Sequence, residues 1–244
     1  MHLIIDVGNT LIKLAIFKDG KLQHKENSKK GKLVKSLQSF HERFPEIQHA
    51  IISSVGGFTA KQLSMVKNIA PLFILTHKAE LPFKNSYSTP STLGVDRIAL
   101  ISAAAKNYPK ENVLVIDCGS CITYDFLNSE NVYLGGAISP GLQMRYKAMN
   151  TYTANLPLLE TKMPENFVGD TTRESMHVGV VQGVIHELEG FIDAYIENFA
   201  TLTVILTGGD AHFLLDRIKN DIFANSNFLL EGLDFLLEIN KDTC

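Results

Sequence analysis

The sequence has no tryptophan, few cysteines and no long apolar run, and the last two absences exclude whole classes of protein. Its three cysteines are an odd, sparse set, which argues against the disulfide framework of a small secreted protein. No apolar run approaches the roughly 20 residues of a membrane span. The N-terminus lacks a basic region and reaches an acid, Asp6, too early for a signal peptide. We therefore expect a cytoplasmic protein that does not bind membranes.

The sequence also lacks a strong excess of charge of either sign. The formal net charge of −3 provides no bulk attraction to nucleic acid or to an anionic membrane. The composition, 45% hydrophobic and 20% charged, is that of an ordinary globular protein. A chain of 244 residues is long enough for one large domain or two compact ones.

Several familiar site motifs are missing. There is neither a G-x-G-x-x-G fingerprint nor a Walker G-x-x-x-x-G-K-[ST] loop, which excludes Rossmann and P-loop nucleotide sites. The eight histidines form no H-x-x-x-H pair, and three cysteines cannot supply a four-ligand zinc site. Cys118 and Cys121 have C-x-x-C spacing, but residues 122–126 alternate like a strand. Redox pairs normally open a helix, so incidental residues of a tight turn are the favoured interpretation.

The chain contains one sequence motif that occurs twice. Residues 3–10 and 114–121 each give an apolar run, an Asp, one further residue, a Gly and a small polar residue. A second β-rich run follows each copy, at 11–17 and 122–127. This order predicts a tight polar hairpin, in which glycine lets backbone amides approach a phosphate and the acid holds the phosphate's cation. Two facing hairpins would form a clamp for a nucleotide.

A second motif pair indicates that the whole domain is duplicated. The apolar strand at 50–54 is followed by Gly56-Gly57, and the strand at 203–206 is followed by Gly208-Gly209. Both pairs recur in the same order, with a longer interval in the second half that predicts an insertion within 143–172. We expect two α/β domains with mixed sheets around a nucleotide cleft, at residues 1–111 and 112–244.

Hydrophobic spacing and cap residues predict the helices. Apolar stripes indicate helices at 33–44, 61–69, 98–107 and 180–199. Ser139 and Pro140 suit the N-cap and first position of a further helix that runs to about Asn150.

The two hairpins have distinct candidate chemistry. In the first, Gly8, Asn9 and Thr10 are candidate hydrogen-bond donors to phosphate, and Lys13 is a candidate point charge. In the second, Asp117 ends a very apolar strand, where a carboxylate needs a cation or hydrogen-bond partners. Oxygen-only surroundings favour a hard cation over zinc or copper. The alternatives are ordinary turns with solvated polar residues.

Two further segments are candidate functional elements. Residues 94–97 lie between a polar loop and a helix, and an acid beside an arginine suits phosphoryl transfer to an alcohol. The alternative is that Asp96 only caps the helix. Gly208 and Gly209 would let an adenine lie against the backbone, or they simply form a strand-to-helix turn.

Taken together, these segments resemble the type III pantothenate kinase family, across almost the whole chain and in family order. The motifs that carry the resemblance are Asp6-Val7-Gly8-Asn9-Thr10 with Lys13, Tyr87, Gly94-Val95-Asp96-Arg97, Asp117-Cys118-Gly119-Ser120, Gly135-Gly136-Ala137-Ile138-Ser139-Pro140-Gly141 and Thr207-Gly208-Gly209. The resemblance implies a duplicated ribonuclease H-like fold of the actin-like ATPase and sugar-kinase superfamily.

The resemblance also implies an activity, which is the ATP-dependent phosphorylation of pantothenate to 4′-phosphopantothenate, the first step of coenzyme A biosynthesis. Asp96 would be the general base, Asp117 would bind a monovalent cation (K⁺ or NH₄⁺), and Mg²⁺ would accompany ATP. The implied pantothenate contacts are Tyr87, Gly94, Val95, Asp96, Arg97 and Thr172. The implied ATP contacts are Asp6, Val7, Gly8, Asn9, Thr10, Leu11, Ile12, Lys13 and Ser120. The family is dimeric, so a homodimer is implied as well.

One departure from the family pattern is visible, because the second hairpin carries Gly119-Ser120 where the family usually has Gly-Thr. Serine keeps the hydroxyl donor. Thr171 adjoins Thr172, so the sequence leaves open which of the two contacts substrate. Two alternative functions also stay open: a non-catalytic ATP-binding regulator on the same fold, and a kinase for another small hydroxylated substrate.

Overall fold

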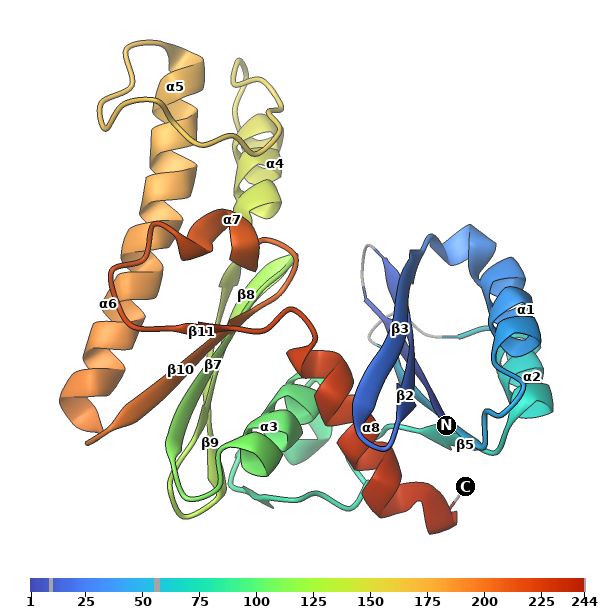
Figure 1. Ribbon diagram of the computed structural model, residues 1–244. Helices are drawn as coiled ribbons and strands as arrows, with labels where there is room; N and C mark the ends of the chain where they lie inside the picture. The colour runs from blue at the N-terminus through green and yellow to red at the C-terminus, as the bar shows by residue number, and fades with distance from the viewer. Residues whose placement is uncertain (9–10, 55–57, 244) are drawn as a thin grey trace. The chain divides into compact units, whose positions relative to one another are not determined.

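The computed structural model describes residues 1–8, 11–54 and 58–243, which form two compact units (Figure 1). The first unit comprises residues 1–110, 130–134 and the segment from Asn227 to the C-terminus, and the second comprises Glu111–Ser129 and Gly135–Ser226. The chain first passes between units at Lys110, next to the predicted boundary. The last helix, α8 (Phe228–Asn240), nevertheless belongs to the first unit, because it packs along α3 (Val95–Asn107).

The first unit contains a five-stranded mixed sheet with the order β3-β2-β1-β4-β5. Its strands are β1 (His2–Val7), β2 (Ile12–Lys18), β3 (Lys21–Ser28), β4 (His49–Ser54) and β5 (Leu72–Ile74). Neighbouring strands are antiparallel from β3 to β1 and parallel from β1 to β5. The central strands β1 and β4 are apolar runs with buried cores, as expected for strands covered on both faces.

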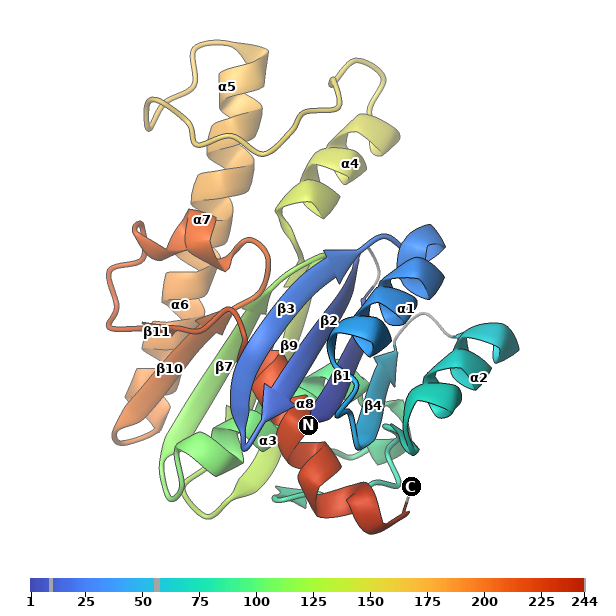
Figure 2. The ribbon, with the colours of Figure 1, turned by 45° about the vertical axis from the view of Figure 1, so that its right-hand side comes forward.

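Helices cover both faces of this sheet (Figure 2). The helices α1 (Leu33–Arg43) and α2 (Ala60–Ile69) lie on one face, where α1 buries Leu33, Leu37 and Phe40 of its predicted stripe. The other face packs against α8 and α3. Short 3₁₀ turns at Lys30–Lys32 and Pro90–Thr92 precede α1 and α3, and β6 (Lys84–Asn85) pairs with the start of β9 (Val132–Pro140).

The second sheet repeats the first. Its order is β11-β10-β7-β8-β9-β6, formed by β7 (Asn112–Cys118), β8 (Cys121–Leu127), β9, β10 (Leu202–Thr207) and β11 (Phe223–Ala224) with β6 at the edge. The β7–β8 pair is antiparallel, and β10 is parallel to both β7 and β11. The run β9-β8-β7-β10-β11 therefore matches β3-β2-β1-β4-β5 in order, which is the duplication that the two motif pairs predict.

Two helices of the second unit begin at residues other than those predicted. They are α4 (Leu142–Tyr152), α5 (Thr172–His177), a π-helical turn (Val178–Gln182), α6 (Gly183–Asn198) and α7 (Ala211–Leu215). The prediction that Ser139 and Pro140 begin a helix is wrong, because β9 continues through Pro140 and Gly141 is the N-cap of α4. The predicted helix at 180–199 begins earlier, at Thr172, and runs through the π turn into α6 (Figure 1).

The described helices include none that is both long and apolar enough to cross a membrane.

Candidate active site

The first hairpin places a buried acid opposite a lysine. Asp6 pairs with Lys13 on β2 and with Ser53 on β4, and Lys13 Nζ lies 3.8 Å from Asp6 Oδ2. The amide of Gly8 donates to the carbonyl of Leu11 at 3.1 Å, which closes the turn. This is the tight polar hairpin that the sequence predicts, although Asn9 and Thr10 lie outside the described residues.

Asp6 is a buried acid whose pKa is raised although Lys13 lies beside it. Its residue is only 6% exposed, and burial raises the pKa of Asp6 to about 6. The ammonium of Lys13 opposes this rise in pKa, whereas the carboxylate of Asp96 adds to it. The carboxylates of Asp6 and Asp96 therefore interact within the first unit. A divalent cation at Asp6 would favour its ionised form.

Asp96 lies in the first turn of α3. The N-cap of this helix is Gly94, which has no side chain to cap it, and Val95 is the first helical residue. Asp96 Oδ1 accepts a hydrogen bond from the amide of Arg97 at 2.9 Å. Its carboxylate thus contacts one first-turn amide without occupying the cap position, and the side chain is partly exposed.

Arg97 follows this acid in the chain, and its guanidinium contacts Tyr87. Arg97 is buried, and its guanidinium lies 5.6 Å from the centre of the Tyr87 ring. That ring stacks on Tyr133, with centroids 6.0 Å apart, and the Tyr87 amide donates to Asn85 Oδ1. The fold therefore gathers Tyr87, Gly94–Arg97 and the first hairpin in one unit. The sequence does not reveal the contact between Tyr133 and Tyr87, because the residues around Tyr133 show only the pattern of a β-strand.

The second hairpin repeats the first with different neighbours. Asp117 pairs with Thr123 on β8 and with Thr207 on β10, so a threonine occupies the position equivalent to Lys13. The Gly119 amide donates to the carbonyl of Cys121 at 3.0 Å. Gly208 has a φ of 100°, and a Cβ there would overlap Asp117 Oδ1 and the Cys118 carbonyl. Carboxylate, hydroxyl and carbonyl oxygens fit a hard cation.

Gly141, which follows β9 and is the N-cap of α4, packs against the same hairpin. Its amide donates to the carbonyl of Ser120 at 3.2 Å, and a Cβ would overlap the carbonyl oxygens of Gly119 and Ser120. The sequence identifies the segment 135–141 as a motif but not this contact. Cys118 is buried on β7, and burial raises the pKa of its thiol, so it is poorly suited to thiolate chemistry.

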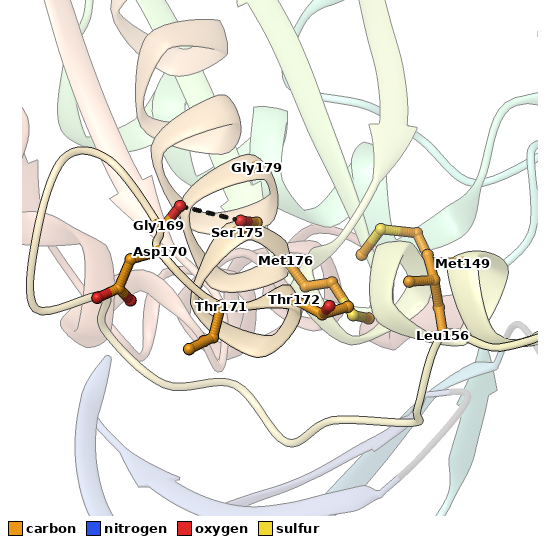
Figure 3. A pocket seen from close by; sticks show the side chains of 9 residues that line it. All are labelled: Met149, Leu156, Gly169, Asp170, Thr171, Thr172, Ser175, Met176 and Gly179. Carbon is orange, nitrogen blue, oxygen red and sulfur yellow. Dashed lines mark hydrogen bonds between the residues drawn. The ribbon is translucent and has the colours of Figure 1, made fainter.

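Thr172 lines a cavity in the second unit (Figure 3). This cavity of about 520 Å³ is lined by Met149, Leu156, Gly169, Asp170, Thr171, Thr172, Ser175, Met176 and Gly179. The hydroxyl of Thr171 accepts from the Glu174 amide at 3.2 Å as the N-cap of α5. Thr171 is therefore used in capping, whereas Thr172 is the first helical residue. The sequence gives no signal for the apolar wall formed by Met149, Leu156 and Met176.

The helix that carries Thr172 is anchored by a buried polar pair. The Tyr146 hydroxyl of α4 lies 2.7 Å from Nδ1 of His177, the last residue of α5, and both residues are buried. Burial is also the main cause that raises the pKa of Tyr146 to about 12.

The described residues contain no cluster of three or more His, Cys, Asp or Glu arranged to hold a metal ion. A cation at either hairpin would therefore also need hydroxyl, carbonyl, water or phosphate oxygens as ligands.

Solved structures of low sequence identity share the fold. One is the activator of the 2-hydroxyisocaproyl-CoA dehydratase from Clostridium difficile with bound ADPNP, with a TM-score of 0.58, 11% identity and coverage of 99% of this chain and 96% of that one. Another is the inorganic polyphosphate/ATP-glucomannokinase from Arthrobacter sp. strain KM, with a TM-score of 0.52, 15% identity and coverage of 99% and 100%. The fold is thus that of the actin-like ATPases and sugar kinases.

Sequence comparison gives the family. The family model for type III pantothenate kinase matches residues 2–194. Two proteins of that name are from Christiangramia forsetii, 48% identical over 99% of both chains, and from Flavobacterium johnsoniae, 46% identical over 96% of both chains. This chain belongs to the type III pantothenate kinase family, whose members phosphorylate pantothenate in coenzyme A biosynthesis.

Proposed function

We propose that this chain transfers the γ-phosphoryl group of ATP to the primary hydroxyl of pantothenate, with Asp96 as the general base. The observation that supports this role is the neighbourhood of Asp96, where the Asp6 carboxylate, the buried Arg97 and the Tyr87 ring lie in one unit. Asp96 takes the hydroxyl proton as the new O–P bond forms, and the bond to the β,γ-bridging oxygen breaks to release ADP.

The first hairpin binds the phosphates of ATP in this proposal. The hairpin that joins β1 to β2 and the Lys13 ammonium bind the phosphate oxygens, and Asp6 would hold the Mg²⁺ that accompanies ATP. When bound, Mg²⁺ neutralises charge on the transferring phosphoryl group. Ser120 of the second hairpin adds a hydroxyl donor, and Asp117, with Thr123 and Thr207 beside it, holds K⁺ or NH₄⁺.

Pantothenate is bound by Tyr87, by residues 94–97 and by Thr172. The Arg97 guanidinium supplies the positive charge that a carboxylate substrate requires. Thr172 opens onto a cavity with an apolar wall and polar rim, which suits a substrate that combines methyl groups with hydroxyl, amide and carboxylate groups.

Two properties of the whole molecule complete the proposal. The enzyme acts as a homodimer, which is supported by large apolar side chains exposed on the second unit, among them Tyr152 (86% exposed), Phe167 (72%) and Val168 (74%). It works in the cytoplasm, where ATP is available. Light scattering during gel filtration measures the oligomeric state, and a monomeric mass would refute the dimer.

The test is a substrate panel with the purified protein, ATP, Mg²⁺ and KCl. We expect 4′-phosphopantothenate from pantothenate and no product from sugars or acetate. Asp96→Asn should lower kcat by about hundredfold or more, in the range of general-base effects, and leave ATP binding intact. Asp193→Asn, an exposed acid of α6, is the matched control. ATP binding without any phosphorylated pantothenate would instead favour a regulator, and full turnover by Asp96→Asn would refute the assigned base.

A further inference from the structure

Glu187 of α6 is the centre of a polar network that the roles above do not use. Its Oε1 accepts from the Tyr124 hydroxyl of β8 at 2.8 Å and also from the Ser139 hydroxyl of β9. Its Oε2 accepts from the guanidinium of Arg145 on α4. One carboxylate therefore binds side chains from three different elements.

Arg145 extends this network to the backbone of the β9–α4 junction. Its Nε donates to the carbonyl of Pro140 at 2.9 Å, while its terminal nitrogen pairs with Glu187. A planar guanidinium can hold both acceptors at once, which a lysine ammonium cannot do with the same geometry. The segment from Ser139 to Gly141 is thereby held by Glu187 at Ser139 and by Arg145 at Pro140.

That junction packs directly against the second hairpin. Gly141 follows Pro140, its amide binds the Ser120 carbonyl, and there is no room for a Cβ between it and Gly119. Movement of residues 139–141 would therefore move Gly119 and Ser120 directly. Tyr124 lies on β8, the strand that leaves the same hairpin, so Glu187 also holds the hairpin's second arm.

The Glu187 carboxylate is held in its charged form. Its burial opposes ionisation, but the donors from Ser139, Arg145 and Tyr124 outweigh that effect, and the pKa of Glu187 lies below its ordinary value. A charged acceptor with three donors makes stronger hydrogen bonds than a neutral amide would.

We infer that Glu187 is a positioning residue for the nucleotide side of the site, acting through Arg145, Ser139 and Gly141 on the hairpin Asp117–Ser120. This inference rests on the proposed function, because it takes Ser120 as a ligand of ATP and Asp117 as the ligand of the monovalent cation. Glu187 then influences the affinity for ATP and K⁺. The affinity for pantothenate depends instead on Tyr87, Arg97 and Thr172.

Kinetics of Glu187→Gln, which keeps the shape of the side chain and removes its charge, provide the main test. We expect the KM for ATP to rise about tenfold, which corresponds to a loss of about 1.4 kcal/mol in the free energy of ATP binding. The K⁺ concentration that gives half-maximal activity should rise in parallel. The KM for pantothenate should stay within about twofold of wild type. Glu197→Gln, the same change at an exposed position of α6, should behave as wild type. Equal increases in both KM values, or an unchanged KM for ATP, would overturn the inference.

A second variant and a binding measurement distinguish a local effect on ATP binding from misfolding of the variant. Arg145→Lys retains the charge but not the bridge to Pro140, so we expect the same direction of change in KM for ATP, with Tm reported for each variant. Calorimetric titration with ATP in the absence of pantothenate should show the same weakening for Glu187→Gln. If the wild type binds ATP but phosphorylates no pantothenate, the proposed function fails, and this titration still decides the role of Glu187.

Discussion

Lys13 and Asp6 face each other across the first hairpin, with 3.8 Å between the ammonium and the carboxylate, and the same position opposite Asp117 holds Thr123. The two copies of one hairpin therefore differ in their charge. The first contains a fixed cation beside its acid. The second offers the side chain of a neutral threonine in the same place.

Loss of the fixed cation should weaken ATP binding. Lys13→Met removes a point charge from the phosphate-binding hairpin, and we expect the KM for ATP to rise about tenfold or more. Lys21→Met, at an exposed position on the neighbouring strand, is the control. Initial-rate kinetics at saturating pantothenate measure the effect, and equal KM values for the two variants would contradict the role of Lys13.

Asp6→Asn should stabilise the unliganded protein while it impairs activity. The folded pKa of Asp6, about 6, lies above its ordinary value of 3.8, so the wild type loses stability as pH rises from about 4 through 6. Asparagine does not ionise, so the variant should be more stable by up to about 3 kcal/mol at pH 7.5 and should show no such gain below pH 4.

Urea denaturation without nucleotide at these two pH values measures the difference in the free energy of unfolding. A variant that is less stable than wild type at pH 7.5 would show that burial does not strain Asp6.

Gly94→Ala should displace the proposed base without unfolding the protein. The backbone of Gly94 has a φ of −59°, which alanine adopts freely, but a Cβ there would overlap Asp96 Oδ1. We expect kcat to fall about tenfold or more, since small displacements of a catalytic group are costly, with little change in Tm. Gly190→Ala on α6, where a Cβ meets nothing within 4 Å, should keep full activity. Normal kcat in Gly94→Ala would contradict the placement of Asp96.

Tyr146→Phe should loosen the helix that carries Thr172. The variant keeps the buried ring but removes the hydroxyl beside His177, at a cost of about 1–3 kcal/mol in stability. We expect the KM for pantothenate to rise more than the KM for ATP. Tyr152→Phe, the same change at an exposed tyrosine of α4, should leave both values unchanged. A larger effect on ATP would place this pair on the nucleotide side.

Much of the fold can be predicted from the sequence because its signals are local. The apolar runs of β1 and β7 end in Asp-x-Gly, and this pattern predicts both hairpins and their duplication. Residues 94–97 are likewise visible as a polar segment in front of an apolar helix. These predictions depend on neighbours in the chain and on the period of hydrophobic residues.

The errors come from contacts between distant residues. Ser139 and Pro140 are good helix-start residues, but the Ser139 hydroxyl binds Glu187 and the strand continues. The π turn at Val178–Gln182 interrupts the hydrophobic period of the long helix. The first turns of this helix, which begin at Thr172, are therefore not predicted by that period. The partners of Gly141 and of Tyr146 are likewise side chains or carbonyls far away in sequence, and no spacing rule predicts them.

The return of α8 to the first unit has a consequence for synthesis of the protein. Gly232 lies so close to the Ala99 carbonyl that α8 and α3 form one tightly packed pair, and α8 also contacts β1 and β4. The unit that contains Asp6 and Asp96 therefore cannot finish folding until residues up to Asn240 have left the ribosome. The second unit ends at Ser226, so a chain truncated near that point would keep every residue of the second unit and would lack the helix that completes the unit of Asp6 and Asp96.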